Sequence, residues 1–162
     1  MSHLSTWIRE TDSLFGFYFI LAVHTVGLAL LVGANTLVDL RILGVGRALP
    51  LKPLKRFFSI MWLGFWINAI SGVFLLIAYP TKAFTNPMFY VKLSCIALGV
   101  IVMQKMKKRV FEDSSLSETA MLAKGRMLAV YSLVMWTAAI GTGRLLAYTY
   151  TYLFYGHYAP GG

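Results

Sequence analysis

The sequence has few acidic residues and almost no thiols. Only six of its 162 residues are Asp or Glu, against fifteen Lys and Arg, and it contains a single cysteine, Cys95. One cysteine cannot form a disulfide framework, so the chain is not a disulfide-stabilised scaffold. The sequence also shows no nucleophile–base pair, no cluster of metal ligands and no glycine-rich phosphate loop in a strand–helix context. These absences argue against the common hydrolases, metal-cluster proteins and nucleotide-binding folds.

Long apolar stretches occupy most of the chain instead. Hydrophobic residues make up 58% of it, and the mean hydropathy is +0.68. Because an α-helix rises about 1.5 Å per residue, stretches of about twenty apolar residues can cross a hydrocarbon core of about 30 Å. Almost nothing remains for a water-soluble domain, so the sequence predicts one all-α transmembrane domain over residues 1–162. This integral membrane four-helix bundle has expected helices at about 14–40, 57–79, 87–107 and 126–155.

Basic residues concentrate in alternate connections, which predicts the orientation. The first and third connections together carry eleven Lys and Arg, whereas the other side has only Arg9 and Lys82. The positive-inside rule then places both basic connections in the cytoplasm and both termini outside. The basic residues lie in loops, not along one helical face, so they do not indicate nucleic-acid binding. The N-terminal segment lacks the basic start of a signal peptide, so we expect the first helix to be retained.

Local signals predict where several helices begin. Asn86 before Pro87 is a good cap for the third helix, with proline in its first turn. Ser115 and Glu118 have the spacing of a capping box. Residues 116–126 are therefore expected to form a short amphipathic cytoplasmic helix before helix 4, either separate from it or continuous with it. At the inner end of the first helix, Arg41 is the expected partner of Asp39.

Polar and small residues share one face of each apolar stretch. Polar side chains in membrane helices generally face the bundle interior, so these faces are expected to point inward. Counted from the outer boundary at the helical rise, His24, Asn68 and Arg144 lie about 15 Å deep. Lys92 lies about 8 Å deep on the same side. The set comprises His24 and Asn35 in the first stretch, Asn68 in the second, Lys92 in the third, and Arg144 and Tyr148 in the fourth.

No carboxylate lies at the depth of Arg144 or Lys92. A deep arginine without an acidic partner snorkels to the interface, binds backbone carbonyls, here those around residues 141–143, or meets an anion from outside the chain. Arg144 is far from the interface, so an anion and the carbonyls are the two main alternatives for it. Lys92 is shallow enough to reach the interface. His24 has two readings as well: a hydrogen bond to a neighbouring helix, or a role as ligand or proton carrier.

The segments HTVGLALLVGANTLVDLRILG, NPMFYVKL and WTAAIGTGRLLAY resemble those of small, uncharacterised four-helix bacterial membrane proteins. More distantly, the chain is similar to copper-resistance D type membrane domains and to the haem-containing bacterial protoporphyrinogen oxidase. His24 and Lys92 match the histidine and lysine of those families, and the resemblance implies His24 as a haem b ligand. The end of the third stretch, VIVMQKMKKR, has no histidine where the oxidase pattern has one. A bacterial inner membrane is the expected location.

Two functions from different classes follow. In the first, the bundle binds haem b or a quinone for electron transfer or porphyrin handling. His24 would ligate the metal or hydrogen-bond the cofactor, and Arg144 and Lys92 would neutralise propionates or a quinone oxygen. Asn68 and Tyr148 complete the predicted cofactor-binding set. In the second, the chain is a cofactor-free subunit that packs in a larger membrane complex or a homo-oligomer. A transporter or metal-handling role is a third reading that requires oligomerisation, and enzymatic activity is left open.

Overall fold

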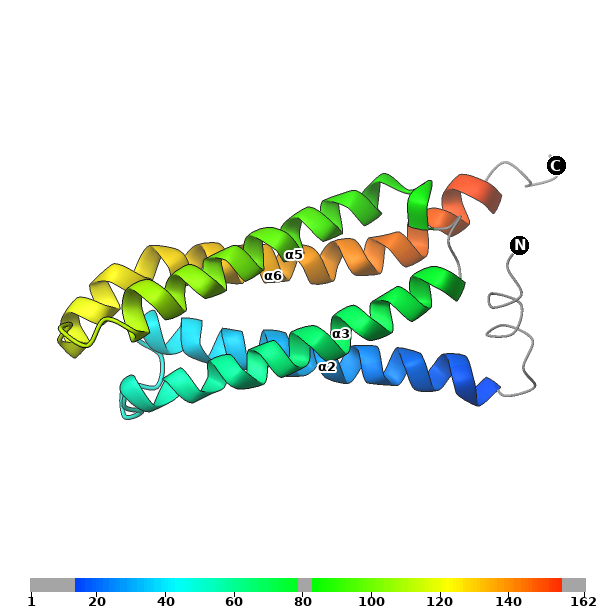
Figure 1. The fold of residues 1–162 in the computed structure, drawn as a ribbon. Helices are drawn as coiled ribbons and strands as arrows, with labels where there is room; N and C mark the ends of the chain where they lie inside the picture. The colour runs from blue at the N-terminus through cyan, green and yellow to red at the C-terminus, as the bar shows by residue number, and fades with distance from the viewer. Residues whose placement is uncertain (1–13, 79–82, 156–162) are drawn as a thin grey trace.

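The computed structural model describes residues 14–78 and 83–155 (Figure 1). Within these ranges it is entirely helical, with no strand, which confirms the predicted fold class. The elements are α2 (Leu14–Ile42), the 3-10 helix η1 (Lys52–Arg56), α3 (Phe57–Ala78), α5 (Pro87–Met106), the π-helical turn η2 (Lys107–Phe111) and α6 (Glu118–Tyr155). The predicted bounds hold within two residues, except that α6 begins eight residues earlier than expected. The segment expected to form an amphipathic helix is thus the start of α6 and is continuous with it.

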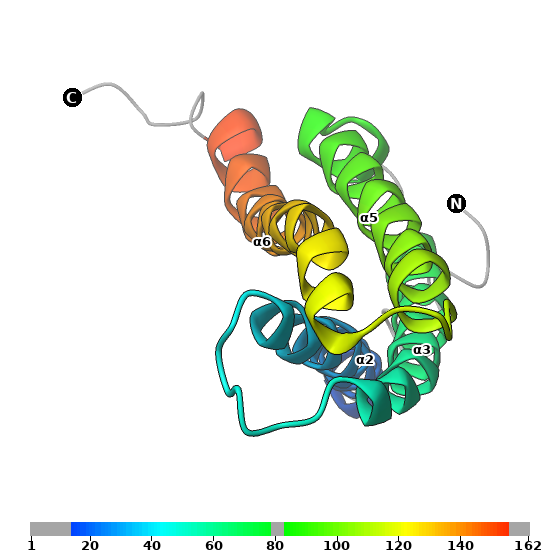
Figure 2. The same cartoon turned by 90° about the vertical axis from the view of Figure 1, so that its left-hand side faces the viewer.

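The four long helices form two antiparallel pairs, α2 with α3 and α5 with α6 (Figure 1). Between the pairs, the main contact is that of α2 with α6. Residues 43–56 and 107–117 meet at one end of the bundle, which faces the viewer in Figure 2. We call this end of the bundle the basic end, because it holds most of the lysines and arginines. The other end of the bundle is called the opposite end.

Most apolar side chains face outward, as they do in a protein surrounded by lipid. All four long helices contain a segment long and apolar enough to cross a membrane, judged by length and composition. Only 11–22% of the residues in the most apolar window of each segment are buried inside the protein. Large side chains such as Phe19, Leu63 and Val134 are more than half exposed. In water, exposed apolar surface of this extent would cause aggregation, so the helices are suited to a lipid environment.

Two glycines allow α2 and α3 to approach closely. A Cβ placed on Gly64 would lie 2.6 Å from the backbone nitrogen of Leu31, and one on Gly27 would lie 2.7 Å from the backbone nitrogen of Asn68. Real Cβ atoms do not come this close to backbone, so the crossing requires glycine on both helices. Small residues at helix crossings are the usual means by which membrane helices gain dispersion contacts.

The contiguous cluster of buried apolar residues lies in the half of the bundle nearer the basic end, and only Ala78 and Ala83 are buried apolar residues outside it among the described residues. Its members on α2 begin at Leu31, those on α3 stop at Met61, and those on α6 stop at Ala139. On α5 the fully buried members begin at Met103, with Cys95 and Ile96 packed against the cluster. Above this level, toward the opposite end, no described residue belongs to the core cluster. Of the polar residues singled out from the sequence, Asn35 lies within the core half, and the others lie in or beside the half that the core cluster does not reach.

The N-termini of α5 and α6 can be compared with the capping residues predicted from the sequence. The Asn86 side chain accepts a hydrogen bond from the Met88 amide at 3.0 Å, and Pro87 is the first helical residue of α5, which confirms the predicted cap. The capping box at Ser115 is wrong. Ser117 caps α6 by accepting from the Ala120 amide, whereas Ser115 instead bonds Asp113. Ser115 and Ser117 are both suitable N-cap residues, and Ser117 is the cap because α6 begins at Glu118.

Candidate functional site

His24 lies on α2 and is held by α3. Its Nδ1 is 3.0 Å from Ser71 Oγ, and Ser71 Oγ lies 2.6 Å from the carbonyl oxygen of Ile67. A serine hydroxyl has one proton, and two carbonyl oxygens of its own helix can accept it, those of Ile67 at 2.6 Å and Asn68 at 3.1 Å. From this network we infer that Ser71 accepts a hydrogen bond from His24 Nδ1–H, which assigns the free lone pair to His24 Nε2. Among the described residues Nε2 has no hydrogen-bond partner, and it is not sealed within the protein.

Asn68 fixes the backbone next to this histidine. It is buried on α3, and its Nδ2 donates to the carbonyl oxygen of His24 at 2.9 Å. Gly72, one turn further along α3, leaves room for the imidazole, since a Cβ there would lie 3.3 Å from His24 Cε1. Asn68 is thus a positioning residue for His24, and Ser71 is a partner that the sequence analysis missed.

Lys92 reaches the same level of the bundle from α5. Its Cδ, Cε and Nζ pack over Gly143 of α6, at 3.7–3.8 Å from the position of a Cβ on that glycine. The charge of Lys92 also acts on His24 across the bundle, so the two side chains lie within electrostatic range of each other. Lys92 is half-buried, and no hydrogen bond or ion pair to it exists among the described residues. The structure therefore brings His24, Asn68 and Lys92 together.

Arg144 and Tyr148 do not join this group. Both side chains are exposed on α6, and Tyr148 is 63% exposed. The expectation that the fourth polar face points inward is therefore wrong within a single chain. The buried face of α6 instead carries Ser132, Trp136 and Ala139. Close packing of Trp136 over Gly99, where a Cβ would lie 3.0 Å from the indole ring, determines the rotation of α6.

A second polar cluster, which the sequence did not predict, lies in the half of the bundle nearer the basic end. Asn35 Nδ2 donates to Asp39 Oδ2 at 2.6 Å and to Ser132 Oγ of α6 at 2.5 Å, and all three side chains are buried. The expected pair of Asp39 with Arg41 is wrong. Residues two apart in an α-helix point to nearly opposite sides, so Arg41 does not face Asp39. Arg41 instead forms an ion pair with Glu118 at 2.7 Å.

The residues near His24 could hold one kind of metal group only. Within the described residues, no three His, Cys, Asp or Glu side chains come together as a metal site. The buried methionines Met61, Met103 and Met106 belong to the apolar core below His24. The described part of the chain therefore offers a single histidine nitrogen at this level, which suits the iron of a macrocycle but not a bare metal ion that needs several protein ligands.

Four long apolar helices, with polar side chains turned inward among outward-facing apolar ones, define a polytopic helical protein of the membrane type. Within that class, the chain belongs to a family of unknown function, DUF6644, whose model matches residues 6–149. No curated protein and no solved structure matches the chain. The family agrees with the predicted resemblance to uncharacterised membrane proteins. The more distant resemblance to copper-resistance D domains and protoporphyrinogen oxidase stays a prediction.

Proposed function

We propose that the half of the bundle nearer the opposite end binds a cofactor, haem b in the first instance, in electron transfer or porphyrin handling. The observation that carries this proposal is the state of His24. Its Nδ1 lies 3.0 Å from Ser71 Oγ, whose proton has backbone acceptors of its own, and the tautomer inferred from these contacts leaves the Nε2 lone pair available. Histidine ligands of metals are typically fixed in this way by a hydrogen bond from the other ring nitrogen.

Two further features support the proposal. The apolar core cluster ends below His24, so the described side chains at this level do not form the continuous apolar packing found in the other half. Lys92 supplies a half-buried ammonium at the same level without a partner among the described residues. An intramembrane cation is costly unless an anion or a polar group meets it.

These residues fit haem b as follows. His24 would be the axial ligand, Lys92 would pair with a propionate, and Asn68 and Ser71 would hold His24 in place. Bound haem would supply one-electron redox chemistry. No second protein ligand for the haem iron occurs at this level among the described residues. Arg144 and Tyr148 are left out of this site because their side chains point away from it.

A quinone is the other cofactor that the same residues suit. Lys92 would donate a hydrogen bond to a quinone oxygen, and His24 Nε2 would accept one from a quinol hydroxyl. Both cofactors need the same imidazole tautomer, so the tautomer cannot distinguish them. They are distinguished by the absorption spectrum of the purified protein and by the small molecule that co-purifies with it.

The test is the absorption spectrum of the full chain purified in detergent from haem-replete cells. We expect a broad high-spin Soret band in the parent, its loss in His24→Ala, and its retention in the matched control His157→Ala. Lys92→Gln should keep the band but release haem more readily. A quinone that co-purifies with the parent and not with His24→Ala, without any Soret band, would favour the quinone. A parent that carries neither would refute the cofactor proposal.

A second candidate, the cofactor-free subunit, is favoured by one specific observation. The exposed face of α6 carries Thr137, Gly141, Arg144 and Tyr148, and a Cβ on Gly141 would meet nothing within 4 Å. An arginine exposed within an apolar helix calls for a partner. Among the described residues no carboxylate lies at its level, so we propose a different membrane polypeptide with an acidic residue. Arg144→Leu should then release the chain from its complex in blue-native electrophoresis, whereas Arg109→Leu should not.

A further inference from the structure

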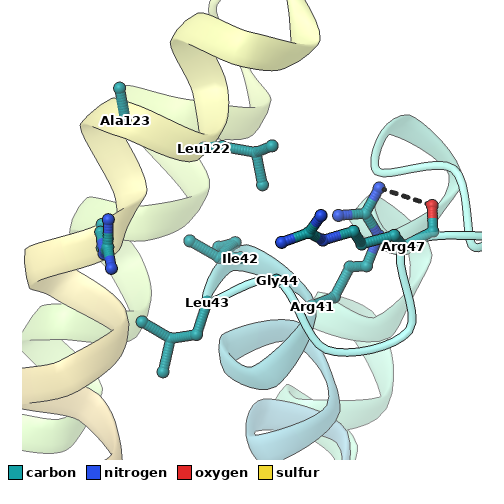
Figure 3. A pocket seen from close by; sticks show the side chains of 8 residues that line it. Arg41, Ile42, Leu43, Gly44, Arg47, Leu122 and Ala123 are labelled. Carbon is teal, nitrogen blue, oxygen red and sulfur yellow. Dashed lines mark hydrogen bonds between the residues drawn. The ribbon is translucent and has the colours of Figure 1, made fainter.

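A cavity of about 460 Å³ lies at the basic end, far from His24, between the end of α2 and the start of α6 (Figure 3). Three arginines line it: Arg41, Arg47 and Arg126. Much of the remaining wall is apolar and includes Leu43 and Leu122. Figure 3 shows the Arg47 side chain extending toward Ile42 and Leu122. The cavity thus combines guanidinium groups with an apolar surface.

The three arginines differ in what they already bind. Arg41 is 4% exposed; it donates to the carbonyl oxygens of Leu49 and Arg47 and pairs with Glu118 at 2.7 Å. These bonds fold the turn around Arg41 and neutralise its charge. By contrast, the side chains of Arg47 and Arg126 are exposed and have no ion pair within the described residues. Two uncompensated guanidinium groups therefore remain for a ligand.

We propose that this cavity binds a phosphate group, supplied by the headgroup of an anionic membrane lipid. Guanidinium groups donate charge-assisted, often paired hydrogen bonds to phosphate oxygens. Basic pockets between transmembrane helices at the membrane surface are suited to anionic headgroups. The apolar wall distinguishes a lipid from free phosphate, because Leu43 and Leu122 provide a surface for the glycerol and the first carbons of an acyl chain. The site is independent of the cofactor proposal.

Lipid binding to the full chain in detergent, measured by native mass spectrometry, tests the proposal. The probes are phosphatidylglycerol, phosphatidylcholine and inorganic phosphate alone. The cavity variant is Arg47→Gln with Arg126→Gln, and the matched control is Lys108→Gln with Arg109→Gln. The control removes the same charge from the same end, at exposed residues outside the cavity. We expect the parent to prefer phosphatidylglycerol over phosphatidylcholine.

The cavity variant should bind phosphatidylglycerol about tenfold more weakly than the control, because it loses the charge-assisted hydrogen bonds of two guanidinium groups to the phosphate. Arg47 and Arg126 are exposed, so the variant should fold, and an unchanged melting temperature without lipid checks this. Equal weakening in both variants would overturn the site, because it would show only general surface attraction. Inorganic phosphate binding as tightly as the lipid would overturn the lipid assignment.

Discussion

Replacing Gly64 by alanine should separate α2 from α3. The new Cβ would lie 2.6 Å from the backbone nitrogen of Leu31 and 2.8 Å from the carbonyl oxygen of Gly27. Ordinary contacts begin near 3.4 Å, so the helices must move apart by about 0.8 Å at the crossing. No flexible side chain can absorb this movement, because both obstructing atoms are backbone. A gap of 0.5–1 Å forfeits about a quarter to a half of each dispersion contact across it.

Overpacking of this kind typically costs about 1–3 kcal/mol, and we expect Gly64→Ala to lower the free energy of unfolding by that amount. The control is Gly33→Ala on α2, where a Cβ meets nothing within 4 Å. It should be neutral or slightly stabilising because alanine favours helix more than glycine. The assay is reversible unfolding in mixed micelles of mild detergent and dodecyl sulfate. Equal stability of Gly64→Ala and Gly33→Ala would refute the close crossing.

Three further predictions concern the ends of the bundle. Arg41→Gln should destabilise the chain by about 1–3 kcal/mol in the same assay, because a buried guanidinium that bonds the carbonyl oxygens of Leu49 and Arg47 is lost. Glu118→Gln should cost less than about 1 kcal/mol because Glu118 is half-exposed. Equal effects would contradict the contacts assigned to Arg41. Hydrogen bonds from Ser115 lower the pKa of Asp113, so this carboxylate favours the folded state above its ordinary pKa, and that contribution is lost as pH falls through the lowered value. Ser115→Ala should raise the pKa of Asp113 toward its ordinary value in an NMR titration, and an unchanged pKa would contradict that cause. In a Cys95→Ser background, membrane-impermeant reagent should label Ser2→Cys and Gly161→Cys on intact cells and miss Ser115→Cys, and the reverse pattern would overturn the predicted orientation.

The sequence was sufficient for features that depend on local physics. Four helices followed from the length of the apolar stretches, since hydrocarbon admits few alternatives for a backbone of this length. The cap at Asn86 followed from the residue pair Asn-Pro and needs no tertiary contact. The start of α6 was harder, because Ser115 and Ser117 are both competent caps and only the geometry of the loop selects Ser117.

The rotation of each helix about its own axis was harder to predict from the sequence than the positions of the helices. On α2, α3 and α5 the polar and small faces do point inward, as expected from the cost of polar groups in lipid. On α6 the packing of Trp136 against Gly99 sets the rotation and leaves Arg144 outside. The rule that polar residues face inward assumes a single chain in lipid, and it does not identify a polar face that stays exposed on that chain.

Contacts between distant segments account for what else was missed. Asn35 with Ser132 joins positions 97 residues apart, and Arg41 with Glu118 joins positions 77 apart. No spacing pattern indicates such pairs. The basic cavity is of the same kind, since Arg47 lies in a turn and Arg126 lies on α6. For His24, the depth and the residue type could be read from the sequence, but its hydrogen-bond partner, Ser71, is seen only in the structure.

The tautomer of His24 is the most direct test of the proposed site, and nitrogen NMR can measure it in cofactor-free protein. The chain would be labelled with ¹⁵N-histidine in lipid nanodiscs, and His3 and His157 would be assigned by substitution. The hydrogen bonds through Ser71 to Ile67 predict a proton on Nδ1 and an unprotonated Nε2 at neutral pH. A proton on Nε2 would contradict this account, since that nitrogen could then neither bind iron nor accept a hydrogen bond from a quinol.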